Sequence, residues 1–302
     1  MKVFIIGSIN MDLVIKTNIM PESGETTIGK GFFKNAGGKG ANQAVAISKA
    51  GVFSEMVGSV GNEFDDILVE GLNKYNVGTS FIKKYDDVSS GVAVIVVNDN
   101  DNRIIVDAGA NNKITEEVVL EVLNNAKKGD YVLLQLEIPI NVVEYTLKIA
   151  KEKELVTVIN PAPADRIKKE YFKYIDYFIV NQSEAMYYTD IYPHTFLEAK
   201  EAVNTIRSLG VNKVIVTLGE QGSYYFDGET EVSTHAYNTE NVDTTSAGDT
   251  YIGFFIASIS QNNSIERSMD LASAAAALCI SKAGAQQSIP SMEEVNDYLE
   301  KK

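Results

Sequence analysis

The sequence predicts an α/β protein with a doubly wound, mostly parallel sheet flanked by helices and a small β-sheet lid. Short apolar runs end at glycine or polar residues, as at residues 3–6 and 131–134, which is typical of strands buried on both faces of a parallel sheet. Helical segments alternate with several of these runs, as they do in parallel α/β sheets. Two further pairs of strand-like segments are joined by turns and have no helices after them. These pairs predict a separate small sheet.

The main series starts with a strand at residues 3–6. Two glycines at residues 37–38 precede a helix. We expect this helix to be established by residue Ala41 and to end at Gly51. Apolar runs of strand length and periodic segments of helical length then alternate along the chain. We expect strands at 54–60, 131–134, 156–159, 177–180 and 213–218, helices at 63–74 and 141–152, an antiparallel hairpin at 224–226 and 231–235, and helices from residue 250, over 271–280 and over 293–302.

The lid is predicted from two hairpins. Strands at 13–19 and 26–33 flank a turn at 20–25, and strands at 90–97 and 103–108 flank a turn-rich stretch at 98–102. The two hairpins either form one shared lid or are separate surface hairpins, and the residues alone favour neither. No linker divides the chain, so we expect a single domain over residues 1–302, with lid strands inserted at about 13–36 and 90–108.

Composition excludes several classes of protein. The 302 residues include 27 basic and 41 acidic side chains, a net charge of −14, so we expect no nucleic-acid partner. The single cysteine, Cys279, excludes an internal disulfide and fits a reducing compartment. No apolar run approaches the ~20 residues that span a bilayer, and the N-terminus does not resemble a signal peptide. We expect a cytoplasmic protein with no membrane partner.

The clearest chemistry lies at residues 243–255, where small polar residues lead into an apolar helix. Free N–H groups at a helix N-terminus attract anions, and Gly248 lets a ligand approach the backbone closely. Asp249 has two interpretations. It is either a first-turn carboxylate that satisfies helix N–H groups, or a general base that takes a proton from an alcohol during phosphoryl transfer.

Other polar side chains follow predicted strands, at the edge of the sheet where α/β proteins bind ligands. Asn10 and Asp12 either bind vicinal hydroxyl groups or form a polar turn. Glu137 either faces the same crevice or is an exposed loop carboxylate. Asn181 and Glu184, three residues apart, either surround a metal or form a capping box.

Two common nucleotide-binding signatures are absent from the sequence. Neither Gly-x-x-x-x-Gly-Lys-Ser/Thr nor a Gly-x-Gly-x-x-Gly after the first strand occurs, which argues against a P-loop and against a dinucleotide-dependent oxidoreductase. His194 and His235 have no Cys or His partner at ligand spacing, so no zinc site is predicted.

Several motifs together resemble the ribokinase-type carbohydrate kinases, in the family's order along the chain. The resemblance covers residues 3–290 and rests on Gly7-Ser8-Ile9-Asn10-Met11-Asp12, Gly37-Gly38-Lys39-Gly40-Ala41-Asn42-Gln43, Gln135-Leu136-Glu137, Asn160-Pro161-Ala162-Pro163-Ala164, Asn181-Gln182-Ser183-Glu184, Thr217-Leu218-Gly219, Asp243-Thr244-Thr245-Ser246-Ala247-Gly248-Asp249 and Gly284-Ala285-Gln286.

The resemblance implies a ribokinase-like fold and ATP-dependent phosphorylation of D-ribose at the 5-hydroxyl. Asp249 would be the base, and the amides of Ala247, Gly248 and Asp249 would hold the transferring phosphoryl group. The sugar would contact Asn10, Asp12, Gly38, Lys39, Asn42, Glu137 and Asp249. The nucleotide would lie against Asn181, Thr217, Gly219, Gly222, Gly248 and Ser273, where the family often has Asn or His at position 273.

The same resemblance implies Mg²⁺, reached by Glu184 through water, and a monovalent cation, K⁺. The K⁺ ligands would be mostly main-chain carbonyls of Asp243, Thr245, Cys279, Lys282, Gly284 and Ser288, with Lys282 in place of the family's Arg. The lid would close over the sugar and pair two subunits into a homodimer.

Two alternatives remain at this point. One is a related kinase for deoxyribose, fructose or a nucleoside, although Asn10 favours a hydroxyl-rich sugar because a deoxy sugar would leave a buried amide unpaired. The other is a sugar-binding regulator without turnover. Asp249 next to Gly248 favours an enzyme, since a regulator has no need of the base.

Overall fold

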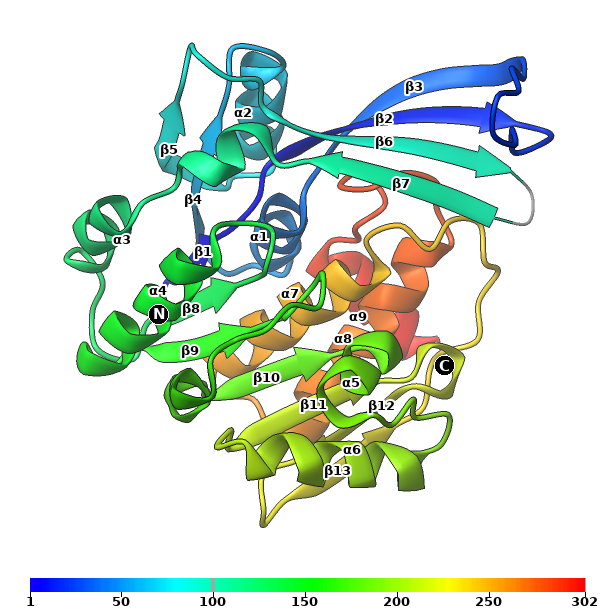
Figure 1. Ribbon diagram of the computed structural model, residues 1–302. Coiled ribbons are helices and arrows are strands. Elements are labelled where there is room, and N and C mark those ends of the chain that lie inside the picture. The colour runs from blue at the N-terminus through cyan, green and yellow to red at the C-terminus, as the bar shows by residue number, and fades with distance from the viewer. Residues whose placement is uncertain (99–100, 302) are drawn as a thin grey trace.

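The computed structural model describes residues 1–98 and 101–301 of the chain. Within this part, a nine-stranded sheet has helices on both faces, and a four-stranded sheet extends from one side of it (Figure 1). The fold is therefore the predicted α/β fold with a separate small sheet.

The large sheet has the order β13-β12-β11-β10-β9-β8-β1-β4-β5. The seven strands from β5 to β11 in this order are parallel, and the two strands at the other edge are antiparallel, as predicted. The order runs outward from β1 in both directions, which makes the sheet doubly wound. Its strands are β1 (Val3–Ile6), β4 (Ser54–Val60), β5 (Gly78–Lys84), β8 (Tyr131–Leu134), β9 (Val156–Ile159), β10 (Tyr177–Val180), β11 (Lys213–Thr217), β12 (Ser223–Phe226) and β13 (Glu231–Thr234).

Alternate residues of the strands point into two hydrophobic cores, one on each face of the large sheet. Ile5 and Ile179 belong to one core, whereas Phe4 and Phe178 belong to the other. The first core is covered by α1 (Lys39–Lys49), α2 (Asp65–Lys74), α7 (Ala247–Ser260), α8 (Ile265–Ile280) and α9 (Met292–Glu300). The second is covered by α3 (Glu116–Leu123), α4 (Ile140–Glu152), α5 (Gln182–Thr189) and α6 (Phe196–Ser208). Three short 3₁₀ turns complete the described elements: η1 (Gly109–Lys113), η2 (Lys169–Tyr174) and η3 (Gly219–Gln221).

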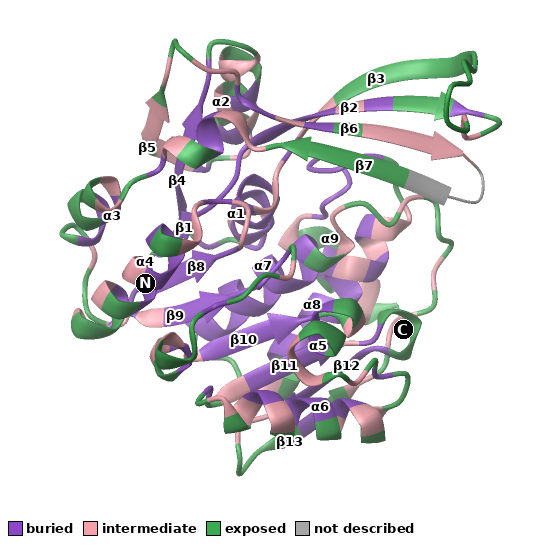
Figure 2. Cartoon of the chain, in the orientation of Figure 1, coloured by how far each residue is buried: buried purple, intermediate pink, exposed green. Residues whose placement is uncertain are grey.

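The small sheet, called the lid sheet below, contains β2 (Asn10–Thr17), β3 (Gly29–Gly37), β6 (Gly91–Asn98) and β7 (Asp101–Asp107) in the order β3-β2-β6-β7. Each predicted hairpin is antiparallel, and parallel pairing of β2 with β6 joins them. Figure 2 shows that much of this sheet is exposed, in contrast to the buried strands of the large sheet. Within the predicted turn at 98–102, Asn98 pairs with Asp101, and residues 99–100 lie outside the described part.

Several predicted boundaries were wrong. The first lid strand begins at Asn10 instead of residue 13, because Asn10 pairs with both Gly37 and Gly91 in the ladder. The helix expected from residue 250 begins at Ala247. The C-terminal helix begins at Met292 and ends at Glu300, and its Val295 is fully buried in the core.

Elements β5, α3 and α6 were not predicted. Strand β5 is half-buried at the sheet edge and carries polar side chains, so it lacks the continuous apolar run of the inner strands.

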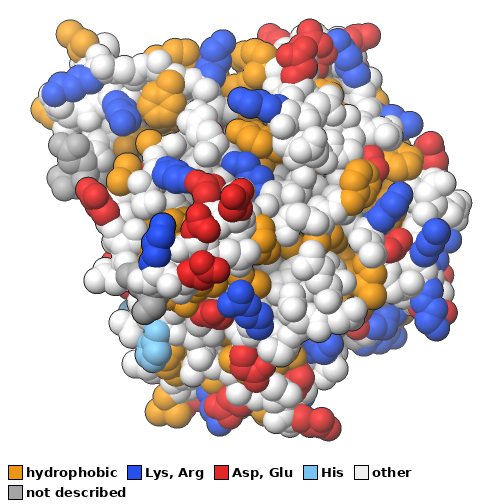
Figure 3. All heavy atoms as spheres, turned by 180° about the vertical axis from the view of Figure 1, so that it is seen from behind, with side chains coloured by type: hydrophobic (Ala, Val, Ile, Leu, Met, Phe, Trp, Pro, Cys, Tyr) orange, Lys and Arg blue, Asp and Glu red, His pale blue; other side chains and the backbone are white. Residues whose placement is uncertain are grey.

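No helix in the described part of the chain combines the length and apolar character needed to cross a membrane. On the face seen in Figure 3, acidic and basic side chains are interspersed among polar and apolar ones. Solvent-exposed ion pairs, such as that between Lys200 and Glu231 at 2.8 Å, contribute little to stability.

Candidate active site

A cavity of about 240 Å³ lies where the carboxyl ends of β9, β10 and β11 meet the N-terminal ends of α1, α5 and α7. Ligands bind at this edge of an open α/β sheet because loops and helix N-termini converge there. The cavity is lined by Lys39, Asn160, Ile179, Val180, Asn181, Glu184, Thr217, Thr244, Ser246, Ala247, Gly248, Asp249 and Ile252.

The carboxylate of Asp249 points across to α1. Its Oδ2 accepts a hydrogen bond from Asn42 Nδ2 at 3.0 Å, and its Oδ1 accepts one from Gln43 Nε2 at 2.9 Å. The N-cap of α7 is Ser246, and no side chain caps this helix end. The interpretation of Asp249 as a capping carboxylate is therefore wrong, because both oxygens are turned away from the helix amides.

The N-terminus of α7 is open to a ligand. Ser246 adopts the left-handed conformation (φ 62°), and Ala247 N–H donates to Thr244 O at 3.2 Å. In the described residues, no acceptor is found for the N–H groups of Gly248 and Asp249. A Cβ at Gly248 would have no atom within 4 Å. Two of the three predicted phosphoryl-binding amides are therefore free, and the third is already bonded.

Gly38 fixes the entry to α1. Its φ of 90° is strained for any other residue, and a Cβ would lie 2.7 Å from Asn10 N and 2.8 Å from Ser8 O. Only glycine lets the start of α1 pack directly on the chain between β1 and β2. This packing brings Lys39, Asn42 and Asn10 to the same region of the molecule.

Lys39 lies among carboxylates. Burial disfavours its ammonium form, yet the charges of Asp249, Glu137 and Glu184 outweigh burial and raise the pKa of Lys39. The Lys39 main-chain N–H donates to Glu137 Oε2 at 3.3 Å, and Ser8 Oγ donates to the same oxygen. Glu137 is therefore not the exposed loop carboxylate considered as an alternative.

Asn10 and Asp12 stand at the start of the lid sheet, 4% and 9% exposed. Asn10 Oδ1 accepts from Asn111 Nδ2 at 2.7 Å, whereas Asn111 Oδ1 accepts from the Ile9 main-chain N–H at 3.0 Å. The Ile9 amide therefore fixes the orientation of Asn111, and Asn111 fixes that of Asn10, whose N–H₂ group remains as the donor.

The side-chain carboxylate of Asp12 accepts no hydrogen bond from any residue within the described ranges. Burial, followed by the charges of Glu137 and Asp249, raises its pKa to about 7. An unpaired, buried carboxyl group beside the Asn10 amide is suited to binding adjacent hydroxyl groups. This arrangement disfavours the polar turn that was the alternative for Asn10 and Asp12, since both residues lie in β2.

Asn181 and Glu184 form the capping box of α5. Glu184 also makes a hydrogen bond outside the capping box, because its Oε2 accepts from Asn160 Nδ2 at 3.3 Å. Burial outweighs these hydrogen bonds and the nearby Lys39, so the pKa of Glu184 is raised. Both residues line the cavity opposite α7. The described residues contain no group of three or more His, Cys, Asp and Glu side chains placed to hold a metal ion.

The predicted nucleotide residues lie in different places. Thr217 lines the cavity at the end of β11, but Gly219, Gly222 and Ser273 do not. A Cβ at Gly222 would lie 1.9 Å from Thr234 O, so close packing against β13 accounts for this glycine. Ser273 is buried in α8.

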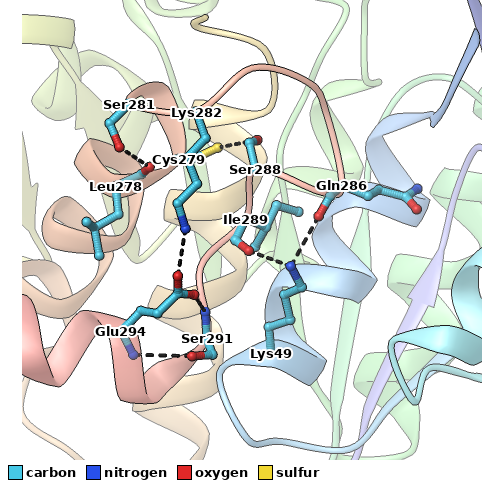
Figure 4. Close-up of polar contacts among 10 residues, drawn as sticks. All are labelled: Lys49, Leu278, Cys279, Ser281, Lys282, Gln286, Ser288, Ile289, Ser291 and Glu294. Atoms are coloured by element: carbon cyan, nitrogen blue, oxygen red, sulfur yellow. Dashed lines mark hydrogen bonds and ion pairs between the residues drawn. The ribbon is translucent and has the colours of Figure 1, made fainter. Parts of the chain in front are cut away.

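The residues predicted to surround K⁺ come together where the segment before α7 meets the end of α8 and the loop after it. Thr245 N–H and Gly284 N–H donate to the two carboxylate oxygens of Asp243, at 2.9 and 3.0 Å, and Cys279 Sγ lies 3.1 Å from Ser288 Oγ. The side chain of Lys282 turns away and bonds Glu294 Oε1 at 2.6 Å (Figure 4).

Sequence reasoning assigned no role to several residues of this site. Lys49 of α1 donates to Gln286 O at 3.3 Å and Ile289 O at 2.5 Å, and so anchors the loop between α8 and α9 (Figure 4). Gln43 and Asn111 are fully buried polar side chains with several partners. Gln43 could have been found from the sequence as a polar residue on the buried face of a predicted helix. No sequence pattern indicates the role of Asn111, because its partners are about 100 positions away.

Comparisons with known proteins agree with this geometry. The pfkB family carbohydrate kinase pattern matches residues 1–292. The chain is 35% identical to the deoxyribokinase of Salmonella typhi over 302 residues, covering 99% of each protein. It is 37% identical to the ribokinase of Lactococcus lactis subsp. lactis over 305 residues, covering 99% of this chain and 97% of that protein. The structure of Arabidopsis thaliana ribokinase complexed with ribose and ATP superposes with a TM-score of 0.89 at 31% identity, over 99% of this chain and 97% of that one.

Proposed function

The chain belongs to the pfkB family of carbohydrate kinases, and we propose that it transfers the γ-phosphoryl group of ATP to the 5-hydroxyl of D-ribose, giving D-ribose 5-phosphate. Family membership makes the chain a phosphotransferase with an alcohol group as acceptor. The observation that carries the proposal is the Asp249 carboxylate, held by two amide donors beside the free N–H groups at the start of α7.

In this reaction Asp249 takes the proton of the sugar 5-hydroxyl while the hydroxyl oxygen forms a bond to the γ-phosphorus. The bond between that phosphorus and the bridging oxygen breaks, and ADP leaves. The N–H groups of Gly248 and Asp249, with the positive end of the α7 dipole, stabilise the charge on the transferring group. Lys39, which lines the same cavity, adds a positive charge.

Sugar recognition is assigned to the side chains at the lid-sheet end. Asn10 offers an N–H₂ donor and Asp12 an unpaired acceptor, while Glu137, Asn42 and Lys39 complete the set around the hydroxyl groups. A sugar with adjacent hydroxyl groups can bond both the Asn10 donor and the Asp12 acceptor, which favours ribose. A deoxyribose kinase is the second candidate, because a deoxyribokinase is among the relatives at 35% identity.

Mg²⁺ and K⁺ are part of the proposal. Glu184, a buried carboxylate on the cavity wall opposite α7, suits an ion that keeps most of its waters, and Mg²⁺ would neutralise charge on the nucleotide phosphates. The Asp243 carboxylate accepts from the N–H groups of Thr245 and Gly284 and so joins two loops, whose main-chain carbonyls would bind K⁺. A cation bound there would brace the loop that leads into α7.

We also propose that the lid sheet closes over the sugar and pairs with a second copy of the chain in the cytoplasm. Its outer strands β3 and β7 are edges, and both carry exposed apolar side chains, including Phe32 at 58% and Ile105 at 75% exposure. Exposed strand edges with apolar faces are commonly covered in an oligomer.

The test is a coupled ADP-release assay with a panel of D-ribose, 2-deoxy-D-ribose, fructose and nucleosides. We expect the highest kcat/KM for D-ribose, with product analysis placing the phosphate on C5. A higher kcat/KM for another acceptor would identify that acceptor as the substrate in place of ribose. Tight sugar binding with no ADP release for any acceptor would favour a non-catalytic regulator.

A further inference from the structure

Gln43 lies directly behind the candidate base. It is fully buried on α1, and its Nε2 donates both to Asp249 Oδ1 at 2.9 Å and to Asn160 Oδ1 at 3.3 Å. Its Oε1 accepts from Gln135 Nε2 at 2.6 Å. One side chain therefore connects the base with two other buried amides, from the ends of β8 and β9.

The orientation of this amide is determined by its partners. An ionised carboxylate only accepts hydrogen bonds, so the N–H₂ group of Gln43 must face Asp249. Its oxygen then faces Gln135, which has to donate. As a result, Gln135 Oε1 is buried without a hydrogen-bond partner in the described part of the chain. Such an unpaired buried acceptor is costly, and its retention points to a functional reason for the orientation.

The second bond of Gln43 leads to the opposite wall of the cavity. Asn160 Nδ2 donates to the Ile179 main-chain carbonyl at 3.1 Å, which fixes the Asn160 oxygen toward Gln43. The same Nδ2 reaches Glu184 Oε2 at 3.3 Å. A continuous chain of hydrogen bonds thus runs from Asp249 through Gln43 and Asn160 to Glu184.

We propose that Gln43 is a positioning residue that holds the Asp249 carboxylate in its proton-accepting orientation and ties it to the Glu184 side of the cavity. The inference rests on the proposed kinase function. Asn42 holds only Oδ2 of Asp249, so without Gln43 the carboxylate can rotate about its last side-chain bond. A base that is misplaced by a fraction of an ångström loses much of its effect on the reaction rate.

Packing of α1 on α7 does not depend on the Gln43 amide. The two helices meet at Gly253, where a Cβ would lie only 2.3 Å from the Ala46 side chain. Gln43→Met keeps the unbranched shape and removes only the polar group. We therefore expect the variant to fold and to bind both substrates.

The test is a double-mutant cycle that measures kcat for Gln43→Met, Asp249→Asn and the double variant by single-turnover transfer from labelled ATP. We expect Gln43→Met to lower kcat on the order of 10- to 100-fold with both KM values within about twofold of the parent. In the Asp249→Asn background, the same substitution should cost no more than about twofold, because the residue acts through the base. Gln261→Met, an exposed site at the end of α7, is the matched control and should match the parent.

An equal loss of kcat in both backgrounds would overturn the inference, because it would show that Gln43 acts independently of Asp249. Unchanged kcat for Gln43→Met, or a loss confined to KM, would also overturn it. Failure of the proposed function looks different. In that case the parent transfers no phosphoryl group to a sugar, or Asp249→Asn alone retains the parent rate.

Discussion

Asp12 should reduce the stability of the folded protein at neutral pH. Raising its pKa from 3.8 to about 7 corresponds to about 4 kcal/mol of unfavourable ionisation in the folded state, at roughly 1.4 kcal/mol per pKa unit. Because the folded state holds this proton more tightly than the unfolded chain, stability falls as pH rises through the window from about 4 to 7. The cause is burial, followed by repulsion from Glu137 and Asp249.

Asp12→Asn removes the ionisable group and keeps the shape of the side chain. Its free energy of unfolding should exceed that of the parent, and the difference should grow by roughly 3 kcal/mol between pH 5 and pH 8. Urea unfolding at the two pH values measures it, with Asp297→Asn, an exposed aspartate, as the control. A difference that stays constant or shrinks with pH would refute the assigned cause. The same variant should lose sugar affinity, since an N–H₂ donor replaces one of the two carboxylate oxygens that can accept from the sugar hydroxyl groups.

Four further perturbations test other parts of the account. Gly38→Ala should destabilise the fold by about 1–3 kcal/mol and lower sugar use, because its φ is 90° and a Cβ would contact Asn10 N; parent-like stability would contradict this. Replacing NaCl by KCl at constant ionic strength should raise kcat, whereas an unchanged kcat would contradict the proposed K⁺ site. Adding sugar should increase hydrogen-exchange protection in all four strands of the lid sheet, and unchanged protection would remove lid closure. Asn10→Ala should raise the sugar KM far more than the ATP KM, and equal losses would contradict its placement.

The large sheet was predictable because its inner strands are buried on both faces. Mostly apolar runs at residues 131–134, 156–159 and 177–180 gave the bounds of β8, β9 and β10 to the residue. The edge strand β5 has no such run. The start of β2 was missed for another reason. Asn10 and Asp12 have low strand propensity, and only pairing with β3 and β6 makes them extended.

The site was predictable as a set of residues, and less so as a set of contacts. Motif resemblance brought Asp249, Glu184 and Thr217 together, and they line one cavity. The direction in which the Asp249 side chain points depends on donors about 206 positions earlier, which no local pattern encodes. The same holds for Asn111, whose partner Asn10 lies 101 positions away.

The central claim is that Asp249 takes the proton of the sugar hydroxyl, and kcat of Asp249→Asn tests it most directly. The account predicts a loss of ~10²- to 10⁴-fold, with sugar and ATP still bound. The N–H₂ group of the new Asn would face an N–H donor of Asn42 or Gln43. The free energy of unfolding should therefore fall by about 1–3 kcal/mol, and the unfolding midpoint with it. Measured well below that midpoint, a folded variant with kcat within a few-fold of the parent would contradict the claim.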